Sequence, residues 1–287
     1  MEISFLLQSV INGLSMGSIY ALMALGLTLI FGMMHIVNFA HGEFFMLGSF
    51  CLFYFFTQFG MNYYVSFVLV IALLFLVGVV LEKIIFRPIT GDVKAQIIAT
   101  LGVSLVLMNG AYLLFGLRPK AVSSVIPGVS KIFGAYVANE RIGAMIAALV
   151  LVGLLYYLLQ KTRLGRACRA VQQNPKAAEL QGVNINRINA IGWGLAAALA
   201  AAGGALVAPI FSVSPSMGVR PCSLAFVIVI IGGLGSIPGA FFSALIIGIV
   251  ESFVSTFIGS EFAWGAIFLL AVLIIILRPQ GLSKGYV

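Results

Sequence analysis

One long polar segment interrupts this chain: KTRLGRACRAVQQNPKAAELQGVNINR, from Lys161 to Arg187. It carries a single acid, Glu179, and six basic residues: Lys161, Arg163, Arg166, Arg169, Lys176 and Arg187. Apolar segments flank it on both sides. Because basic loops between two membrane-spanning segments lie on the cytoplasmic side, we expect residues 160–187 to form a cytoplasmic loop.

A short helix is predicted inside this loop, with a signal at each end. Asn174 can accept hydrogen bonds from backbone N–H groups of a first turn, and Pro175 suits the first helical position. Gly182 suits the left-handed position that stops a helix. A helix of about two turns is marginal alone in water, so we expect a partner to hold it. The alternative interpretation is an ordinary solvated loop that positions two spans.

The composition predicts an all-α integral membrane protein. Hydrophobic residues make up 62% and charged residues 8% of the 287 positions, against about 25% charged in soluble domains. The mean hydropathy is +1.15. The net charge of +8 is confined to loops, so we expect membrane lipid and not nucleic acid as a partner. Cys51, Cys168 and Cys222 have no paired spacing, which predicts neither a metal site nor a disulfide.

The apolar segments predict one polytopic domain, residues 1–287, with about eight or nine transmembrane helices. The run 222–231 is too short to cross a core of about 30 Å as a straight helix. Residues 188–211 are rich in Ala and Gly, which predicts tight packing against other helices.

The basic break 82–94 should be cytoplasmic and the loop 118–140 external. No Lys or Arg precedes Lys83, so the orientation of the N-terminus is not set. The other expected spans are residues 5–31, 44–59, 63–86, 96–117, 141–159, 240–258 and 263–277.

Two glycine-bounded stretches break the apolar pattern, Gly32–Glu43 and Gly232–Gly239. Each precedes two Phe and an apolar run, in GMMHIVNFAHGEFFMLGS and IGGLGSIPGAFFSALIIG, which we interpret as a weak internal repeat. Paired breaks of this kind indicate a transport site, because irregular backbone at membrane depth needs protein or a water-filled cavity around it. The alternative is two tight turns between ordinary spans. The candidate residues for a translocation path are His35, Asn38, His41, Gly42, Glu43, Gly232, Gly235, Ser236 and Gly239.

Two carboxylates, Glu43 and Glu251, fall inside or at the start of apolar segments. Buried carboxylates are costly and should face the bundle interior or a pathway. Either could meet an ammonium group, although for Glu251 we favour a structural role. The sequence offers no Lys or Arg in the interior of an apolar segment to bind a carboxylate, so the path is expected to lack a cation. His35 and His41 have no third metal ligand, and no P-loop or HExxH motif is present, so we do not expect an enzyme.

Four blocks, taken together, resemble the permease subunits of branched-chain amino-acid ABC importers. They are NFAHGEFFMLGS (Asn38–Ser49), RLGRACRAVQQNPKAAELQGVN (Arg163–Asn184), GGLGSIPGA (Gly232–Ala240) and RPQGL (Arg278–Leu282). Related permeases dock on their ATPase through a pattern close to EAA, followed by Gly. Lys176-Ala177-Ala178 and Gly182 match this pattern, except that Lys176 replaces the acid. The resemblance implies ATPase-coupling roles for Arg163, Gly165, Arg166, Arg169, Asn174, Pro175, Ala177, Ala178 and Gly182.

The resemblance also implies a set of partners and a location. The partners are a second homologous permease, two cytoplasmic ATP-binding subunits and an extracytoplasmic amino-acid-binding protein. The chain itself would need no cofactor, because ATP is hydrolysed by the partner subunits. The expected location is the plasma (inner) membrane of a bacterium or archaeon, crossed several times.

Other functions stay open. Within the same importer family the substrate could be urea, a short amide or another amino acid. An ion-coupled secondary transporter would need its own coupling site, and the sequence shows no membrane-embedded pair of acids. A membrane scaffold or enzyme anchor would not need broken helices.

Overall fold

The fold is a helical bundle, which the computed structural model describes for residues 2–132 and 134–283. The predicted all-α architecture with several apolar spans is confirmed, and a two-stranded hairpin is added to it. The elements in chain order are α1 (Glu2–Met34), α2 (His41–Leu52), η1 (Phe53–Gln58), α3 (Tyr63–Leu81), η2 (Glu82–Phe86), η3 (Arg87–Ile89), α4 (Val93–Phe115), β1 (Val129–Ile132), β2 (Ala135–Ala138), α5 (Asn139–Lys161), α6 (Arg163–Gln173), α7 (Pro175–Leu180), α8 (Ile185–Val207), α9 (Val219–Gly232), α10 (Ile237–Phe257) and α11 (Ala263–Leu277).

Six helical stretches in the described residues are long and apolar enough to cross a membrane. They are α1, α3 with η2 and η3, α4, α5, α8 and α10. The apolar helices α9 and α11 are shorter, and α2 continues into η1. The expected number of eight or nine transmembrane helices therefore depends on how these shorter segments cross.

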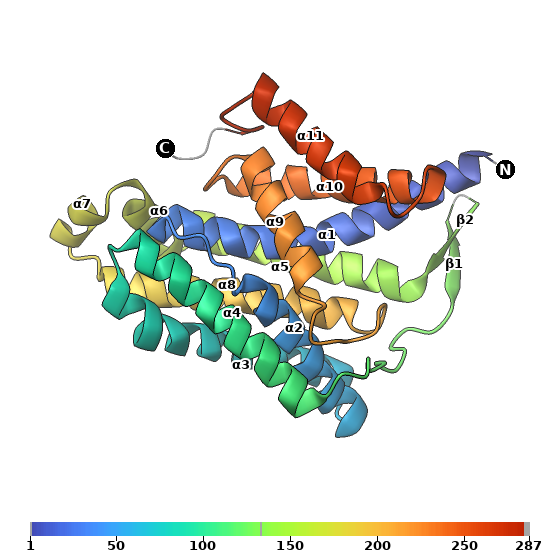
Figure 1. Cartoon of the computed structure of the whole chain (residues 1–287), viewed down its shortest axis with the longest axis horizontal. Coiled ribbons are helices and arrows are strands. Elements are labelled where there is room, and N and C mark those ends of the chain that lie inside the picture. Colours follow the sequence, from blue (N-terminus) through green and yellow to red (C-terminus); the bar gives the residue numbers. More distant parts are fainter. Residues whose placement is uncertain (1, 133, 284–287) are drawn as a thin grey trace.

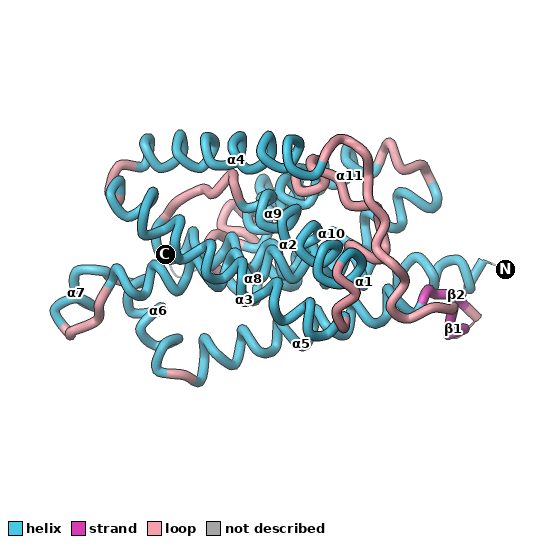
Figure 2. Tube along the Cα trace, turned by 90° about the horizontal axis from the view of Figure 1, so that it is seen from below, coloured by secondary structure: helices cyan, strands magenta, loops and turns pink. Residues whose placement is uncertain are grey.

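The bundle has two distinct ends (Figures 1 and 2). Helix α7 projects at one end, which we call the α7 end. The antiparallel hairpin of β1 and β2 lies at the other, which we call the hairpin end. Sequence analysis predicted the loop 118–140 but not this hairpin within it.

The first predicted break is an extended stretch that returns into the bundle. α1 ends at Met34, and residues 35–40 are not helical. His41 starts α2, and its Nε2 lies 3.1 Å from the carbonyl oxygen of Met23. Met23 precedes the end of α1 by 11 residues, or about 16 Å at 1.5 Å per residue. Helix α2 therefore begins deep inside the bundle, after a non-helical stretch.

The second predicted break, Gly232–Gly239, has a different structure. Here α9 ends at Gly232 and α10 begins at Ile237, with only a short turn between them. The backbones of Gly232 and Gly239 pack so closely that a Cβ on Gly239 would lie 1.9 Å from the carbonyl oxygen of Gly232. The expectation was a broken or re-entrant segment, with a tight turn as the alternative, and the structure has a tight turn between two helices here.

The geometric counterpart of α2 is the start of α9, which the sequence pattern did not indicate. Val213 pairs with Lys120 near the hairpin end, and only five residues later Gly218 lies against Gly42 of α2. A Cβ on Gly218 would lie 2.0 Å from the carbonyl oxygen of Gly42. Helices α2 and α9 thus begin side by side inside the bundle, each after a segment without regular helix.

Small residues allow the close packing of α8 at the centre, as the Ala- and Gly-rich sequence predicted. A Cβ on Gly204 would lie 1.9 Å from the carbonyl oxygen of Phe45 in α2. Ser49 of α2 donates a hydrogen bond of 2.8 Å to the carbonyl oxygen of Gly204. This contact fixes α2 against α8 and thereby sets the depth at which α2 begins.

Replacing Gly204 with Leu should destabilise the protein by about 3 kcal/mol or more, because the backbone of α2 cannot move aside without breaking this packing. The matched control is Gly110→Leu in α4, where nothing lies within 4 Å of an added Cβ. Thermal unfolding of the purified proteins in detergent should show a lower Tm for Gly204→Leu alone. Equal Tm values for the two variants would contradict the packing argument.

Candidate functional sites

The predicted loop helix is present as α7. Asn174 Oδ1 accepts a hydrogen bond of 3.0 Å from the backbone N–H of Ala177, and Pro175 occupies the first turn. Gly182 has a φ of 80°, the left-handed conformation that glycine adopts without strain. The predicted N-cap and stop are therefore confirmed.

Helix α7 presents nearly all of its surface outward. Ala178 is its only buried residue, whereas Leu180 is 87% exposed. Leu180 is therefore a large apolar side chain held out at the tip of a polar helix, where it is available for contact with another protein. Sequence analysis did not select Leu180, although an isolated Leu in a polar segment was the available signal.

The corner between α5 and α6 explains several residues of the basic loop. Thr162 Oγ1 accepts a hydrogen bond of 3.1 Å from the N–H of Gly165, and a Cβ on Gly165 would collide with the carbonyl oxygen of Leu159. Arg169 donates to that same carbonyl oxygen. Arg169 therefore holds the corner, while Arg163 and Arg166 are exposed at the α7 end.

Gln172 joins the basic loop to the interior of the bundle. Its Nε2 donates a hydrogen bond of 3.3 Å to the carbonyl oxygen of Gly235 in the α9–α10 turn. The same side chain lies against Gly32 near the end of α1. One residue of α6 thus contacts two regions that the sequence selected separately as breaks. Gln172 was not among the predicted site residues.

The predicted path residues of the second break lie beside this contact. Gly235 accepts from Gln172, and Gly232 and Gly239 form the close α9–α10 crossing. Ser236 is buried and caps α10, its Oγ accepting a hydrogen bond of 3.2 Å from the N–H of Gly239. These residues position helices at the α7 end.

The predicted path residues of the first break are mostly buried and incompletely hydrogen-bonded. His35 is exposed, with a φ of 55°, and Gly42 packs against Gly218. Glu43 Oε1 accepts a hydrogen bond of 3.0 Å from Ser104 Oγ. Within the described residues no partner is found for Asn38 Nδ2, His41 Nδ1 or Glu43 Oε2. Buried polar atoms without a hydrogen-bond partner are costly. The packing of this stretch therefore leaves hydrogen-bond donors and acceptors unsatisfied.

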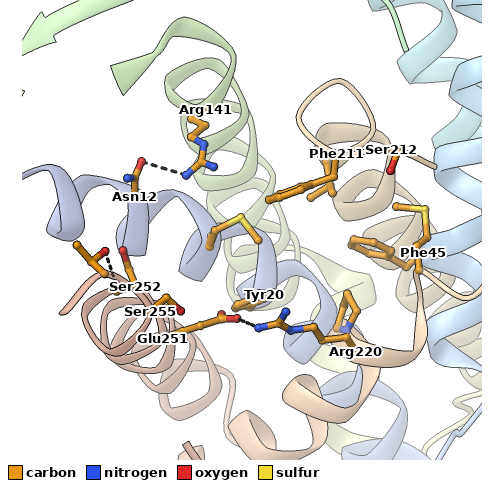
Figure 3. A pocket seen from close by; sticks show the side chains of 16 residues that line it. Asn12, Tyr20, Phe45, Arg141, Phe211, Ser212, Arg220, Glu251, Ser252 and Ser255 are labelled. Atoms are coloured by element: carbon orange, nitrogen blue, oxygen red, sulfur yellow. Dashed lines mark hydrogen bonds and ion pairs between the residues drawn. The ribbon is translucent and has the colours of Figure 1, made fainter. Parts of the chain in front are cut away.

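A cavity of about 460 Å³ lies in the half of the bundle toward the hairpin end (Figure 3). None of the predicted path residues lines it. It is bounded by α1, α2, α5, the end of α8, the 211–217 segment, the start of α9, and α10. Its lining residues are Asn12, Met16, Tyr20, Phe45, Arg141, Val207, Phe211, Ser212, Met217, Arg220, Pro221, Gly248, Glu251, Ser252, Ser255 and Thr256.

The cavity contains two arginines and one carboxylate. Arg220 donates a hydrogen bond of 2.5 Å to Glu251 Oε1, and Arg141 Nη1 donates one of 3.0 Å to Asn12 Oδ1. Sequence analysis selected neither arginine. Residues 208–218 fold inward and place Arg220, in the first turn of α9, at the wall of the cavity. Glu251, for which we favoured a structural role, both pairs with Arg220 and lines the cavity.

A multi-pass helical bundle with an internal cavity and an outward-facing loop helix is the architecture of a membrane transport protein. The family model described as "branched-chain amino acid transport system / permease component" matches residues 9–277. The chain therefore belongs to this family of ABC transporter permeases. It is a transport component of the inner membrane and not an enzyme.

Individual relatives match over nearly the full length. The high-affinity branched-chain amino acid transport system permease protein BraD of Pseudomonas aeruginosa is 32% identical, over 98% of this chain and 96% of BraD. LivH of Escherichia coli K12, described in the same words, is 31% identical, over 97% and 95%. A probable LivH of Methanocaldococcus jannaschii is 28% identical, over 93% and 89%.

Two solved structures show a more distant likeness. PsaBC from Streptococcus pneumoniae in complex with Fab has a TM-score of 0.48 at 12% identity, covering 93% of this chain and 89% of that chain. An inward-facing conformation of a putative metal-chelate type ABC transporter has a TM-score of 0.45 at 16% identity, covering 94% and 85%.

The variants Asn38→Cys and Ser236→Cys should report whether the two predicted breaks become accessible during transport. Both positions are buried here, at 0% and 3% exposure, so a small water-soluble thiol reagent should modify the introduced thiols slowly in this state. We expect faster modification in another nucleotide state of the complex.

The native Cys168 provides an internal control for this labelling. Burial raises the pKa of its thiol to about 11, so it stays protonated at neutral pH and reacts slowly. Uniform protection of both introduced thiols in every nucleotide state, measured by mass spectrometry, would argue against a path at these positions.

Proposed function

We propose that this chain is the membrane-spanning permease subunit of an ABC importer and forms the translocation path for branched-chain or related amino acids. The observation that carries the proposal is the exposed, doubly capped helix α7 in a chain whose relatives over nearly its full length are named as permeases of branched-chain amino acid transport systems.

The distribution of charge supports a cytoplasmic α7 end. Ten described basic residues lie at or near that end, namely Lys83, Arg87, Lys94, Lys161, Arg163, Arg166, Arg169, Lys176, Arg187 and Arg278. Five lie toward the hairpin end, namely Arg118, Lys120, Lys131, Arg141 and Arg220. Cytoplasmic loops carry the excess of Lys and Arg. With this orientation the N-terminus is external, the C-terminus is cytoplasmic, and the chain crosses nine times if residues 35–58 and 208–232 each cross once.

Helix α7 is the proposed docking element for a cytoplasmic ATPase. Its cap at Asn174 and its stop at Gly182 hold it rigid, and Leu180 supplies an exposed apolar anchor. Burying one Leu in a partner's pocket stabilises a complex by about 1.5–3 kcal/mol. The complete importer would contain a second homologous permease, two ATP-binding subunits and an extracytoplasmic binding protein, with ATP bound and hydrolysed by the ATP-binding subunits.

A continuous set of contacts leads from α7 into the bundle. Helix α6 precedes α7 directly, and Gln172 near its end contacts both Gly235 and Gly32. These two glycines belong to the α9–α10 turn and to α1. Helices α1, α9 and α10 all contribute residues to the cavity, so movement of a docked ATPase would reach the cavity walls through Gln172.

Transport by the reconstituted importer tests the proposed function directly. In proteoliposomes holding the permease pair and both ATPases, with the binding protein added, uptake of radiolabelled L-leucine should require ATP. A protonophore at constant ATP should change the rate little, because direction comes from ATP hydrolysis and not from an ion gradient. A rate that collapses with the protonophore would favour a secondary transporter, and preferred uptake of urea or a short amide would correct the substrate.

Replacing Gly182 with Val should weaken docking of the ATPase. A β-branched residue strongly disfavours the left-handed conformation, while nothing lies within 4 Å of the new Cβ, so the effect stays local to the end of α7. The matched control is Gly60→Val, which introduces the same strain at a φ of 67° with equally free surroundings. Less ATPase should co-purify with Gly182→Val than with Gly60→Val, and equal recovery would refute α7 as the docking helix.

A further inference from the structure

We propose that the cavity between α1, α5, α9 and α10 is a binding site for a zwitterionic amino acid with an aliphatic side chain. The inference rests on the proposed function and adds to it a site inside a single permease subunit. Its volume of about 460 Å³ falls within the range of about 300–1,000 Å³ found for small-molecule sites.

Arg141 is the group that would receive the carboxylate. Its guanidinium contacts Asn12 Oδ1 and lies over the ring of Phe211, with 6.0 Å to the ring centroid. Among the described side chains it forms no ion pair. A partly buried cation without a carboxylate partner is costly, and the guanidinium fork has spare donors in the geometry that binds a carboxylate.

Glu251 is the group that would receive the ammonium. One of its oxygens accepts from Arg220, and the Tyr20 hydroxyl lies beside the carboxylate, but Oε2 is buried and accepts no hydrogen bond of ordinary geometry from the described residues. An ammonium group carries three donors and can satisfy such an acceptor. Figure 3 shows the Arg220–Glu251 pair on one side of the cavity and Arg141 with Asn12 on another.

The remaining walls fit an aliphatic side chain. Met16, Phe45, Val207, Phe211 and Met217 contribute apolar surface. Two arginines against one carboxylate leave the cavity with one uncompensated positive charge. A zwitterionic ligand leaves this net charge unchanged, but its carboxylate can pair with Arg141 while its ammonium lies against Glu251.

The cavity lies where an amino acid released on the extracytoplasmic side would enter the permease. It lies toward the hairpin end, which is extracytoplasmic in the proposed orientation, and α9 begins at its wall with Arg220 in the first turn. A helix N-terminus carries a partial positive charge that adds to the attraction for a carboxylate. An amino acid released on that side would reach this cavity before it reached the α7 end.

The test measures protection of a cysteine placed in the cavity wall, Ser255→Cys, in the complete permease–ATPase complex in nanodiscs. The reagent is methyl methanethiosulfonate, which is small and neutral, so charge changes in the cavity do not steer it. The probes are L-leucine, L-leucinamide, which lacks the carboxylate, and 4-methylpentanoate, which lacks the ammonium. L-Leucine should protect at concentrations roughly ten-fold lower than either analogue, because each analogue loses one charge-assisted contact.

Charge-removing variants should abolish this discrimination selectively. In Arg141→Gln the advantage of L-leucine over leucinamide should disappear, and Arg141→Lys should restore part of it. In Glu251→Gln the advantage over 4-methylpentanoate should disappear. Matched controls are Arg118→Gln and Glu261→Gln, which remove the same charges from exposed positions outside the cavity and should leave both advantages intact.

Failure of this inference is distinguishable from failure of the proposed function. If the reconstituted importer transports L-leucine but L-leucine does not protect the thiol of Ser255→Cys, the cavity proposal is overturned and the function stands. Equal protection by all three probes would also overturn it, because charge would play no part. Should Glu251→Gln fail to assemble, Glu251→Asp keeps the carboxylate at a shorter reach and should reduce the preference over 4-methylpentanoate. An unchanged preference in that variant would contradict the role of Glu251.

Discussion

The contact between Gly42 and Gly218 is the constraint on which the rest of the structure depends. Two backbones meet there at a distance that leaves no room for a Cβ on either residue. Helices α2 and α9 can therefore begin side by side within the bundle. Each half-length helix requires a non-helical segment to reach its start, and such backbone survives at membrane depth only where protein surrounds it. The surrounding helices supply these partners, as when Thr100 of α4 donates a hydrogen bond of 3.4 Å to the carbonyl oxygen of Val37.

The same constraint links the centre of the bundle to its α7 end. Because α9 begins in the interior, its fourteen residues are enough to reach the α7 end, where the turn at Gly235 meets Gln172. Tight glycine packing joins α9 to α10 and α1 to α10. Contacts therefore connect α6, through Gln172, with the helices that carry Arg220 and Glu251.

Local signals in the sequence were sufficient for α7 and for the first break. The cap at Asn174 and the stop at Gly182 act within a few residues, so their chemistry is readable without the fold. The inward path of residues 208–218 was not predictable in this way, because it depends on Gly42, which is far away in sequence. For the same reason nothing in the sequence indicated that Arg141, at the start of an expected span, and Arg220, just before the short run 222–231, share one cavity with Glu251. Gln172 carried no distinguishing signal, since its role consists of contacts with Gly32 and Gly235.

The charged side chains that line the cavity are better suited to letting a substrate pass than to holding it. Glu251 is already paired with Arg220, so an ammonium group must share that carboxylate and cannot gain a full ion pair. Arg141 likewise shares its donors with Asn12. Conduction requires sites that bind well enough to admit a substrate and weakly enough to release it. At the proposed site a departing zwitterion would leave Glu251 paired with Arg220 and Arg141 hydrogen-bonded to Asn12, so only part of each group's interactions would be lost.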